Sequence, residues 1–435
     1  MRRDFLFVFK YVPFFLEIFP TYVTFTTKRK YKETNSCMNT KITNKKGNVT
    51  VAFSGKLDTY SCSVAMTEIN SQLAELGEIT SLTCDMAEVD YISSSGLRLM
   101  LSLAKKYKTF NIVEVQSEVY HVFEMTGFTK MMHVEKALRR LSIDGCVEIG
   151  RGGVGIVYRI DDDTIIKVFR EGTTLEAVQT EITMAKEAFV LGMPTAISFD
   201  IVHVGSQYGL VYELLRADTL SACIAREPTR LDEFARLYAG LFRQLHGIEV
   251  PTSSSIPCAL ERQEQAIRHI GRYFDTSSID LLLRIASCIP QGNRLLHCDL
   301  QTKNAMIQSD NELMLIDMGE VAYGHPMIDL GYAYSSMVTL TGDYQQMIGL
   351  PRDVGKEMYH KMLGYYFNGL DAAEQAHRLE QIKAVACIRN YSWLSLSDSF
   401  PEVVIRQCQE LFQERVVRHK DYLLGICETL SDWTL

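Results

Sequence analysis

The stretch that decides the fold of this chain is His297-Cys-Asp299-Leu-Gln-Thr-Lys-Asn304, which is followed by Ile316-Asp317-Met-Gly319. The first segment reads H-x-D-x-x-x-x-N, and the aspartate of the second ends a short apolar strand predicted over 313–316. Phosphoryl transfer needs one carboxylate that orients and deprotonates the attacking hydroxyl, and an amide and a second carboxylate that hold Mg²⁺ against the phosphates. Asp299 suits the first, catalytic role, and Asn304 and Asp317 suit the metal site. The first segment alone could equally be a hydrophilic loop between two strands, so upstream residues must decide.

A glycine-rich segment with the letters VEIGRGGVGIVY lies upstream, at 147–158. The G-x-G-x-x-G pattern also opens dinucleotide-binding folds, in which a helix follows the glycines. Here residues 156–158 are β-branched and aromatic, which predicts a strand and therefore a hairpin that could cover phosphates. The nucleotide-binding residues predicted in this hairpin are Gly150, Gly152, Gly153, Gly155 and Val157.

A lysine, Lys167, stands in the apolar return strand that is predicted over 164–169. A glycine-rich hairpin with a lysine on the next strand is the arrangement of kinases, in which the lysine contacts the nucleotide phosphates. Alternatively, a lysine in an apolar strand protects the edge of a sheet. The kinase interpretation makes Lys167 both a catalytic and a nucleotide-binding residue.

The segment 175–191 has helical spacing and offers three carboxylates that could pair with Lys167. Glu181 is favoured over Glu176 and Glu187, because it shares the helix face of the small and apolar residues at 184, 185 and 188, which should point toward the sheet. Glu181 is therefore the third predicted catalytic residue.

An apolar strand is predicted over 209–215, and it ends in polar residues. Its position suits a hinge between two lobes, where backbone groups could bond an adenine. Glu213 and Leu215 are the predicted hinge residues of a nucleotide site.

Together these residues resemble the kinase-like superfamily, and within it the aminoglycoside phosphotransferase and choline kinase branch. The resemblance covers about 146 to 398, and the segment 297–304 looks like the H-G-D-L-H-x-x-N of that branch, with Cys298 and Gln301 as departures. Gly324-His-Pro-Met-Ile-Asp329 resembles the aspartate segment that follows the metal site in that branch. A protein kinase would carry an arginine before its catalytic aspartate, D-F-G and A-P-E, none of which is present here, although the glycine loop is closer to the protein-kinase form.

The resemblance implies a bilobal protein-kinase-like fold over 146–435, with an N-lobe at about 146–215 and a C-lobe at about 216–435. It also implies ATP and Mg²⁺ as cofactors and the hydroxyl group of a small molecule, aminoglycoside-like or choline-like, as acceptor. Four aromatic residues of the C-lobe could form a box for a quaternary ammonium group: Tyr332, Tyr334, Tyr391 and Trp393.

A separate unit is predicted over 47–141, where strand and helix patterns alternate in the manner of a small α/β domain. Gly55–Thr59, Tyr91–Leu97 and Val122–Phe128 resemble the STAS domain, the fold of bacterial anti-sigma factor antagonists. In that family the first serine of an Asp-Ser-Ser/Thr-Gly stretch is the regulatory phosphosite, and alignment on the glycine gives Ser94. The aspartate of the family is Ser93 here, so the alternative is that these serines only cap a helix.

The rest of the chain contains no further motif, but it limits the domain boundaries, the possible partners and the compartment. The first 46 residues are predicted to be an N-terminal extension, disordered or the result of a start upstream of Met38, and 142–145 is a short linker. The aromatic run 5–24 is interrupted by charges and prolines, which predicts no membrane span. Among 435 residues, a net charge of −8 argues against a nucleic-acid partner, and eleven cysteines without C-x-x-C pairs indicate free thiols in a reducing cytoplasm. The STAS resemblance implies a bacterial source.

Three functions follow from these observations. The first is ATP- and Mg²⁺-dependent transfer of a phosphoryl group to a small-molecule hydroxyl, with the STAS domain as a regulatory part that could bind a protein partner. The alternative is a signalling protein whose kinase-like domain phosphorylates a STAS serine, its own or that of a partner. A nucleotide-sensing scaffold without catalysis is the third, and we rank it last because every residue needed for transfer is present.

Overall fold

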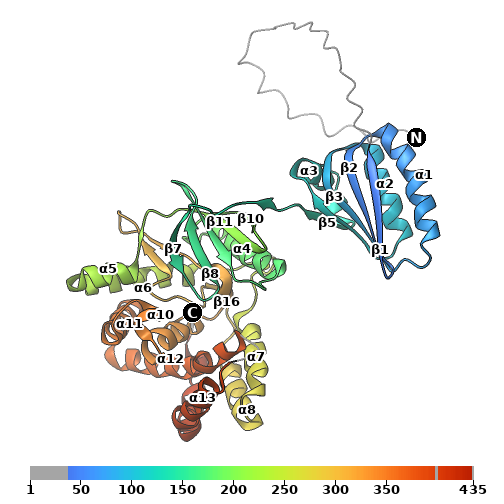
Figure 1. The fold of residues 1–435 in the computed structure, drawn as a ribbon. Helices are drawn as coiled ribbons and strands as arrows, with labels where there is room; N and C mark the ends of the chain where they lie inside the picture. Colours follow the sequence, from blue (N-terminus) through green and yellow to red (C-terminus); the bar gives the residue numbers. More distant parts are fainter. Residues whose placement is uncertain (1–37, 397–399, 434–435) are drawn as a thin grey trace, which may run out of the picture. The chain divides into compact units, whose positions relative to one another are not determined.

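The computed structural model describes residues 38–396 and 400–433. The chain divides into two compact units, the first ending at Ala137 and the second beginning at Leu138 (Figure 1). The fold class expected from the sequence is α/β plus α+β, a small α/β domain followed by a bilobal protein-kinase-like fold, and this prediction is confirmed. Most of the predicted N-terminal extension, residues 1–37, lies outside the described residues. So does Asp398, where the family resemblance was predicted to end.

The first unit contains a five-stranded sheet in the order β1-β2-β3-β4-β5, in which only β1 and β2 are antiparallel. Its strands are β1 (Asn39–Lys45), β2 (Asn48–Leu57), β3 (Ser81–Ile92), β4 (Phe110–Val115) and β5 (His133–Lys136). The prediction that residues up to 46 form an extension is wrong for β1, which pairs with β2 along its whole length. Its sequence, NTKITNK, is mostly polar, as suits an edge strand, and therefore carries no apolar pattern that would have revealed it.

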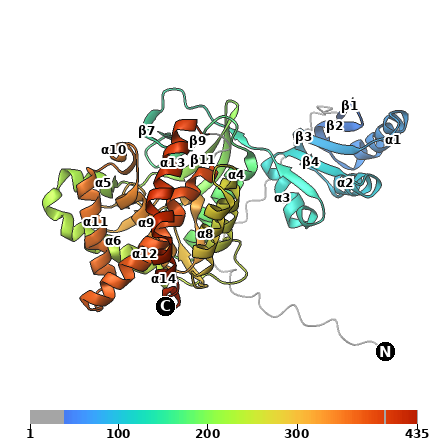
Figure 2. The same cartoon turned by 90° about the horizontal axis from the view of Figure 1, so that it is seen from below.

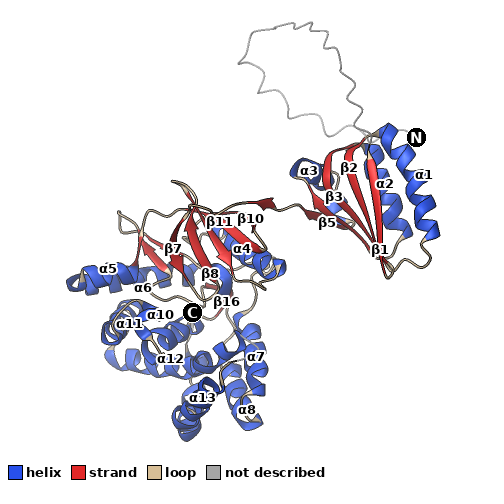
Figure 3. Ribbon diagram, viewed as in Figure 1, coloured by secondary structure: helices blue, strands red, loops and turns tan. Residues whose placement is uncertain are grey.

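Three helices cover one face of this sheet: α1 (Thr59–Glu75), α2 (Ser94–Lys106) and α3 (Ser117–Met125) (Figure 3). Side chains from all three helices share a core with alternate residues of β2, β3 and β4. Gly96, in the first turn of α2, allows the close approach, because a Cβ atom there would lie 2.6 Å from Ile92 Cγ1. A short 3-10 turn, Phe128–Lys130, precedes β5.

The boundary between the units lies before the predicted linker at 142–145. β6 (Arg139–Arg140) pairs in parallel with β10 (Ser198–Val204), and Leu141 N donates to His203 O at 2.9 Å. Residues 138–141, predicted to end the first domain, therefore belong to the second unit, and Ile143 of the linker packs against its core. A two-residue strand that is recruited by a distant sheet edge has no local sequence signal.

The N-lobe of the second unit is a six-stranded sheet in the order β6-β10-β11-β9-β8-β7. Its remaining elements are β7 (Val147–Arg151), β8 (Gly155–Arg159), β9 (Thr164–Phe169), β11 (Gln207–Glu213) and the helix α4 (Leu175–Val190). Val178 and Ile182 of α4 share a small core with Phe169 and Leu210, which fixes α4 on the sheet.

The C-lobe is built mainly from helices (Figure 2), which share one large core, and it also contains two small sheets, β12-β14-β15 and β13-β16. Its strands are β12 (Asp218–Thr219), β13 (Arg294–Leu296), β14 (Ala305–Ile307), β15 (Leu313–Leu315) and β16 (Ala322–Gly324). Its helices are α5 (Leu220–Arg226), α6 (Leu231–Gly247), α7 (Ala259–His269), α8 (Thr276–Ser287), α9 (Met327–Tyr334), α10 (Tyr344–Ile348), α11 (Arg352–Tyr366), α12 (Ala372–Ser392), α13 (Glu402–Arg415) and α14 (Lys420–Cys427), and a π-helical turn, Ser335–Thr339, extends α9.

Across the described ranges, no helix combines the length and apolarity that a membrane crossing needs. The sequence of 403–424 predicts one long helix, but this segment is divided in the structure. It breaks at Val416 between α13 and α14, where two consecutive β-branched valines lower helix propensity.

Candidate active site

The glycine segment forms the predicted hairpin. β7 and β8 pair antiparallel, and Gly152 N donates to Gly155 O at 2.9 Å to close the turn. At Gly155 a Cβ atom would lie 2.3 Å from Val168 O, so only glycine lets β8 approach β9 here. At Gly153 a Cβ atom would meet nothing within 4 Å. This open turn has room for a ligand beside it.

Lys167 lies opposite Val157 in the sheet, and its ammonium group bridges two carboxylates. Its Nζ donates to Glu181 Oε1 at 2.8 Å and to Asp317 Oδ1 at 2.9 Å. Tyr212, on β11, adds a hydrogen bond from its hydroxyl group to Glu181 Oε1 at 3.0 Å. The contacts join the N-lobe sheet, α4 and the end of β15, and so bring three predicted site residues together.

The two competing glutamates point elsewhere. Glu176 lies in the first turn of α4 and is exposed. Glu187 accepts hydrogen bonds from Ser254 and Ser255. Among the three candidates, only Glu181 contacts the lysine.

Asp299 follows β13 in a loop that is held by its own side chains. Asn304 Nδ2 donates to Asp299 Oδ2 at 2.9 Å and to the Asp299 carbonyl oxygen at 2.8 Å. Asp299 N donates to Nδ1 of His297 at 3.3 Å, and Nε2 of the same ring lies 3.1 Å from Ile316 O. His297 therefore links the loop that carries Asp299 to the residue before Asp317.

A second carboxylate, Asp329 on α9, fixes the start of this loop. It is fully buried and accepts from the backbone N–H of Cys298 at 2.7 Å and of His297 at 3.0 Å. His246 Nε2 lies 3.3 Å from the same side chain. These bonds hold Cys298 at φ +61°, a left-handed conformation that a non-glycine residue adopts at a cost of about 1–3 kcal/mol when its surroundings impose it.

Asn304 and Asp317 lie at one end of the β14–β15 hairpin. Ile316 N donates to Asn304 O at 3.0 Å, so Asn304 lies beside Ile316, the residue before Asp317. Asp317 itself has φ +66°. The Asn304 amide nitrogen donates to Asp299, which leaves the side-chain carbonyl oxygen of Asn304 available to a metal ion. The described residues contain no group of three or more His, Cys, Asp or Glu that could hold a metal. Two protein oxygens fit Mg²⁺, which keeps several waters and binds through one or two side chains together with phosphates.

The charges of the site are strongly coupled. Burial raises the pKa of Asp299 to about 6, although the charges of Arg389 and His297 oppose the rise. Burial alone would lower the pKa of Lys167, but Asp317 and Glu181 hold it above its ordinary value. Burial would likewise raise the pKa of Asp317, and Lys167 instead holds it below its ordinary value. At neutral pH all three groups are therefore charged.

The predicted hinge residues lie where β11 ends. Glu213 N donates to Ile197 O at 3.0 Å, and the Glu213 carboxylate accepts from Ile197 N at 2.8 Å. Leu215 is partly buried in the segment that leads to β12. The Glu213 N–H is thus engaged within the protein, and its role toward a nucleotide stays a prediction.

The four aromatic residues predicted to form a box each contact a different partner. Tyr334 packs on Tyr359, Tyr391 on Phe412, and Trp393 on Phe400. The face of Tyr332 is covered by the Arg389 guanidinium, whose Cζ lies 4.7 Å from the ring centroid. The rings are core and packing residues, and they do not build a cage for a quaternary ammonium group.

In the first unit, Ser94 is the first residue of α2 and is exposed. The neighbouring Ser93 is the N-cap, since its Oγ accepts from Ser95 N at 3.2 Å and donates to Leu57 O at 2.9 Å. The capping role therefore belongs to Ser93, and phosphorylation of Ser94 stays a prediction.

Sequence reasoning assigned no role to Tyr212, His297 or Asp329. One signal was present for Asp329, because a carboxylate inside the apolar run Met-Ile-Asp-Leu-Gly must receive hydrogen bonds when it is buried. No local pattern distinguishes Tyr212 from other strand tyrosines, since its partner lies on α4.

Comparison with known proteins matches residues 147–365 to the phosphotransferase enzyme family (APH) and residues 39–140 to the STAS domain. Among solved structures, the aminoglycoside phosphotransferase APH(2'')-Ib with bound ADP is similar at 16% identity and a TM-score of 0.42, over 62% of this chain and 92% of that one. An ethanolamine kinase from Plasmodium vivax is similar at 15% identity and a TM-score of 0.44, over 63% and 84%. An anti-sigma factor antagonist from Mycobacterium paratuberculosis is similar at 20% identity and a TM-score of 0.21, over 22% and 85%. No curated protein sequence matches significantly.

Proposed function

Because this chain belongs to the phosphotransferase enzyme family, we propose that it transfers the γ-phosphoryl group of ATP to a hydroxyl group of a small molecule, with Mg²⁺ as cofactor. Family membership makes the protein a kinase, a phosphotransferase with an alcohol group as acceptor. The nucleotide, the metal and the small size of the acceptor belong to the proposal.

One observation carries it: the ammonium group of Lys167 lies within hydrogen-bond distance of both Glu181 and Asp317. Glu181 orients the lysine from the N-lobe, and Asp317 approaches it from the C-lobe. Because a cation that binds phosphate and a carboxylate that binds metal must meet at one triphosphate, their contact supports a single nucleotide site between the lobes.

In the proposed reaction, the acceptor oxygen forms a bond to the γ-phosphorus while the bond from that phosphorus to the bridging oxygen of ADP breaks. The electron pair of the broken bond stays on ADP. The proton of the acceptor hydroxyl moves to Asp299, whose pKa of about 6 leaves it ionised at neutral pH yet able to accept a proton. Lys167 steadies the phosphates, and the glycine hairpin excludes water above them.

Asn304 and Asp317 would hold Mg²⁺ through their side-chain oxygens. The bound ion would neutralise phosphate charge and keep the phosphates in line with the acceptor. In the proposed reaction only Asp299 changes its protonation.

The test is ADP release by Asp299→Asn with MgATP and a panel of aminoglycosides, choline, ethanolamine, sugars and homoserine. The variant should bind ATP as the wild type does and lose turnover by about 10²–10⁴-fold, because general base catalysis contributes that much. Turnover near that of the wild type would remove Asp299 from the role.

A second candidate function is phosphorylation of a STAS serine, and the exposure of Ser94 favours it. A phosphate there would add nearly two negative charges at the N-terminus of α2, which would alter the binding of a protein partner. Mass spectrometry after incubation with MgATP separates the two functions. Phosphate on Ser94 supports signalling, whereas an unmodified protein that still phosphorylates a small acceptor supports the first proposal.

A further inference from the structure

Arg389, near the C-terminal end of α12, is partly buried, and its guanidinium makes no hydrogen bond or ion pair within the described part of the chain. The guanidinium lies over the face of Tyr332, with its Cζ 4.7 Å from the ring centroid. Stacking on a ring leaves the five N–H groups of a guanidinium unsatisfied, because those groups lie in its plane.

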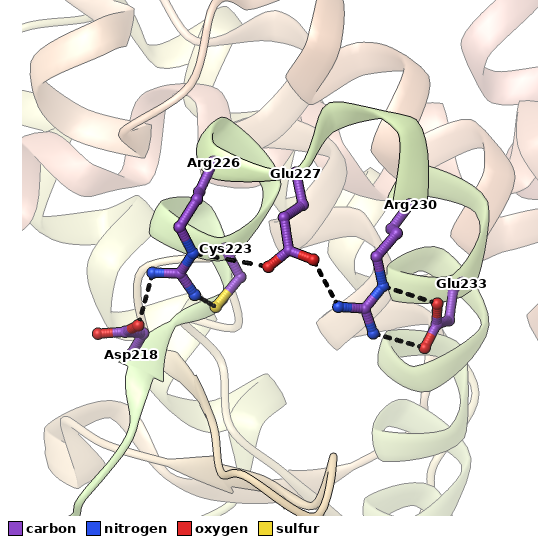
Figure 4. Close-up of polar contacts among 6 residues, drawn as sticks. All are labelled: Asp218, Cys223, Arg226, Glu227, Arg230 and Glu233. Atoms are coloured by element: carbon purple, nitrogen blue, oxygen red, sulfur yellow. Dashed lines mark hydrogen bonds and ion pairs between the residues drawn. The ribbon is translucent and has the colours of Figure 1, made fainter.

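Other arginines of the chain behave differently. Arg226 and Arg230, after β12, are bound by three carboxylates, Asp218, Glu227 and Glu233 (Figure 4). Every other partly buried arginine that the structure describes donates at least one hydrogen bond to a carboxylate, an amide or a backbone carbonyl; these are Arg230, Arg262, Arg294, Arg352 and Arg378. Arg389 is the exception among them.

The packing of α9 against α12 places this guanidinium beside the reaction centre. Asp329 of α9 binds the loop that carries Asp299, and Tyr332 follows one helical turn later. Gly331 allows α12 to come close, since a Cβ atom there would lie 2.9 Å from Val385 Cγ1, one turn before Arg389. Arg389, through Tyr332 and Asp329, is therefore connected to the loop that carries Asp299.

A guanidinium that is partly removed from water needs an acceptor in its plane, because an unpaired charge in such a place is costly. Asp299 and Glu320 lie close enough to interact with Arg389 through space, but neither forms an ion pair with it. Carboxylate and phosphate match the guanidinium fork with two parallel hydrogen bonds. A quaternary ammonium group, by contrast, would be repelled by Arg389 and finds the face of Tyr332 covered.

We propose that the acceptor carries an oxyanion, a carboxylate or a phosphate, which pairs with Arg389 while the acceptor hydroxyl lies at Asp299. This inference rests on the proposed function and names its substrate class. It replaces the aminoglycoside-like or choline-like acceptor that resemblance implied with an acidic hydroxyl compound.

The experiment measures ADP release from MgATP by the full chain with matched acceptors. Glycerol 3-phosphate and glycerate are compared with glycerol, and choline and an aminoglycoside supply the cationic arm. We expect kcat/KM for at least one acidic acceptor to exceed that for glycerol and for the cations by about 100-fold, the range of one buried charge pair. The phosphate and carboxylate arms then distinguish the two oxyanions.

Two variants assign the preference to Arg389. Arg389→Met should raise the KM for the acidic acceptor about 100-fold, with little change in the KM for ATP. Arg389→Lys should recover part of the loss, because lysine keeps the charge and loses the fork. The matched control is Arg378→Met, which removes an arginine that also lies on α12 over an aromatic ring, Trp433. It should leave the acceptor KM unchanged.

The outcomes separate this inference from the proposed function. Turnover of neutral or cationic acceptors at least as fast as acidic ones overturns the inference and leaves the proposed function standing. An unchanged acceptor KM in Arg389→Met does the same, and if that variant does not fold, an unchanged KM in Arg389→Lys decides. If the wild-type protein phosphorylates no acceptor of any charge and releases ADP no faster than Asp299→Asn, both the inference and the proposed function are refuted.

Discussion

Replacing Asp329 by asparagine should destabilise the second unit and misplace Asp299. The carboxylate accepts from two backbone N–H groups, at 2.7 Å and 3.0 Å, with a different oxygen for each. An asparagine has one acceptor oxygen and one NH₂ donor, so whichever way it turns, a donor faces a buried N–H. The loss of one hydrogen bond to a charged group costs about 1.5–3 kcal/mol, and an unsatisfied buried donor adds about 1–3 kcal/mol. We expect a total of about 3–5 kcal/mol, as for other broken buried charge pairs.

The chain offers a clean assay for this change. Its two tryptophans, Trp393 and Trp433, both lie in the second unit, so their fluorescence during urea unfolding reports that unit alone. The control Asp280→Asn alters an exposed aspartate of α8 and should change the unfolding free energy by less than about 0.5 kcal/mol. Because the loop that carries Asp299 begins at these two N–H groups, turnover under folded conditions should fall by about 100-fold. A variant whose unfolding free energy and turnover both match those of Asp280→Asn would refute the reasoning.

Three further results are expected. Lys167→Met should lower turnover by at least about 100-fold, because it removes the proposed phosphate contact and the cation that pairs with two carboxylates. Steady-state ADP release checks this, and an unchanged rate contradicts the assignment. Gly155→Ala should raise the KM for ATP, since its Cβ would lie 2.3 Å from a carbonyl oxygen of β9, whereas Gly153→Ala, whose Cβ meets nothing within 4 Å, should behave as the wild type; equal effects would contradict the packing argument. Burial lowers the pKa of His325 from 6.5 to about 4, so on acidification the unfolded chain takes up this proton before the folded one. The free energy of unfolding of the wild type relative to His325→Gln should therefore fall between pH 6.5 and 4, by on the order of 2–3 kcal/mol, and a difference independent of pH would contradict it.

Sequence alone predicted the candidate site residues of this protein and the local geometry around them. The H-x-D-x-x-x-x-N segment, the glycine hairpin at 150–155 and a lysine in an apolar strand are short-range patterns. Such patterns can be recognised in a sequence because each residue type is required by its own backbone conformation or by its role in the reaction. The helix face of 175–191 likewise favoured Glu181 over its neighbours, and the structure places that side chain against Lys167.

Only the tertiary structure decided which surfaces meet. The polar edge strand β1 and the two-residue strand β6 exist because distant strands offer them hydrogen-bond partners. Through the packing of α9 with α12, Asp329 binds the Asp299 loop, and Arg389 lies on Tyr332 with no ion partner among the described residues. Spacing along a chain specifies which face of an element is apolar, but the partner of that face is selected by shape and by the satisfaction of buried polar groups over the whole fold.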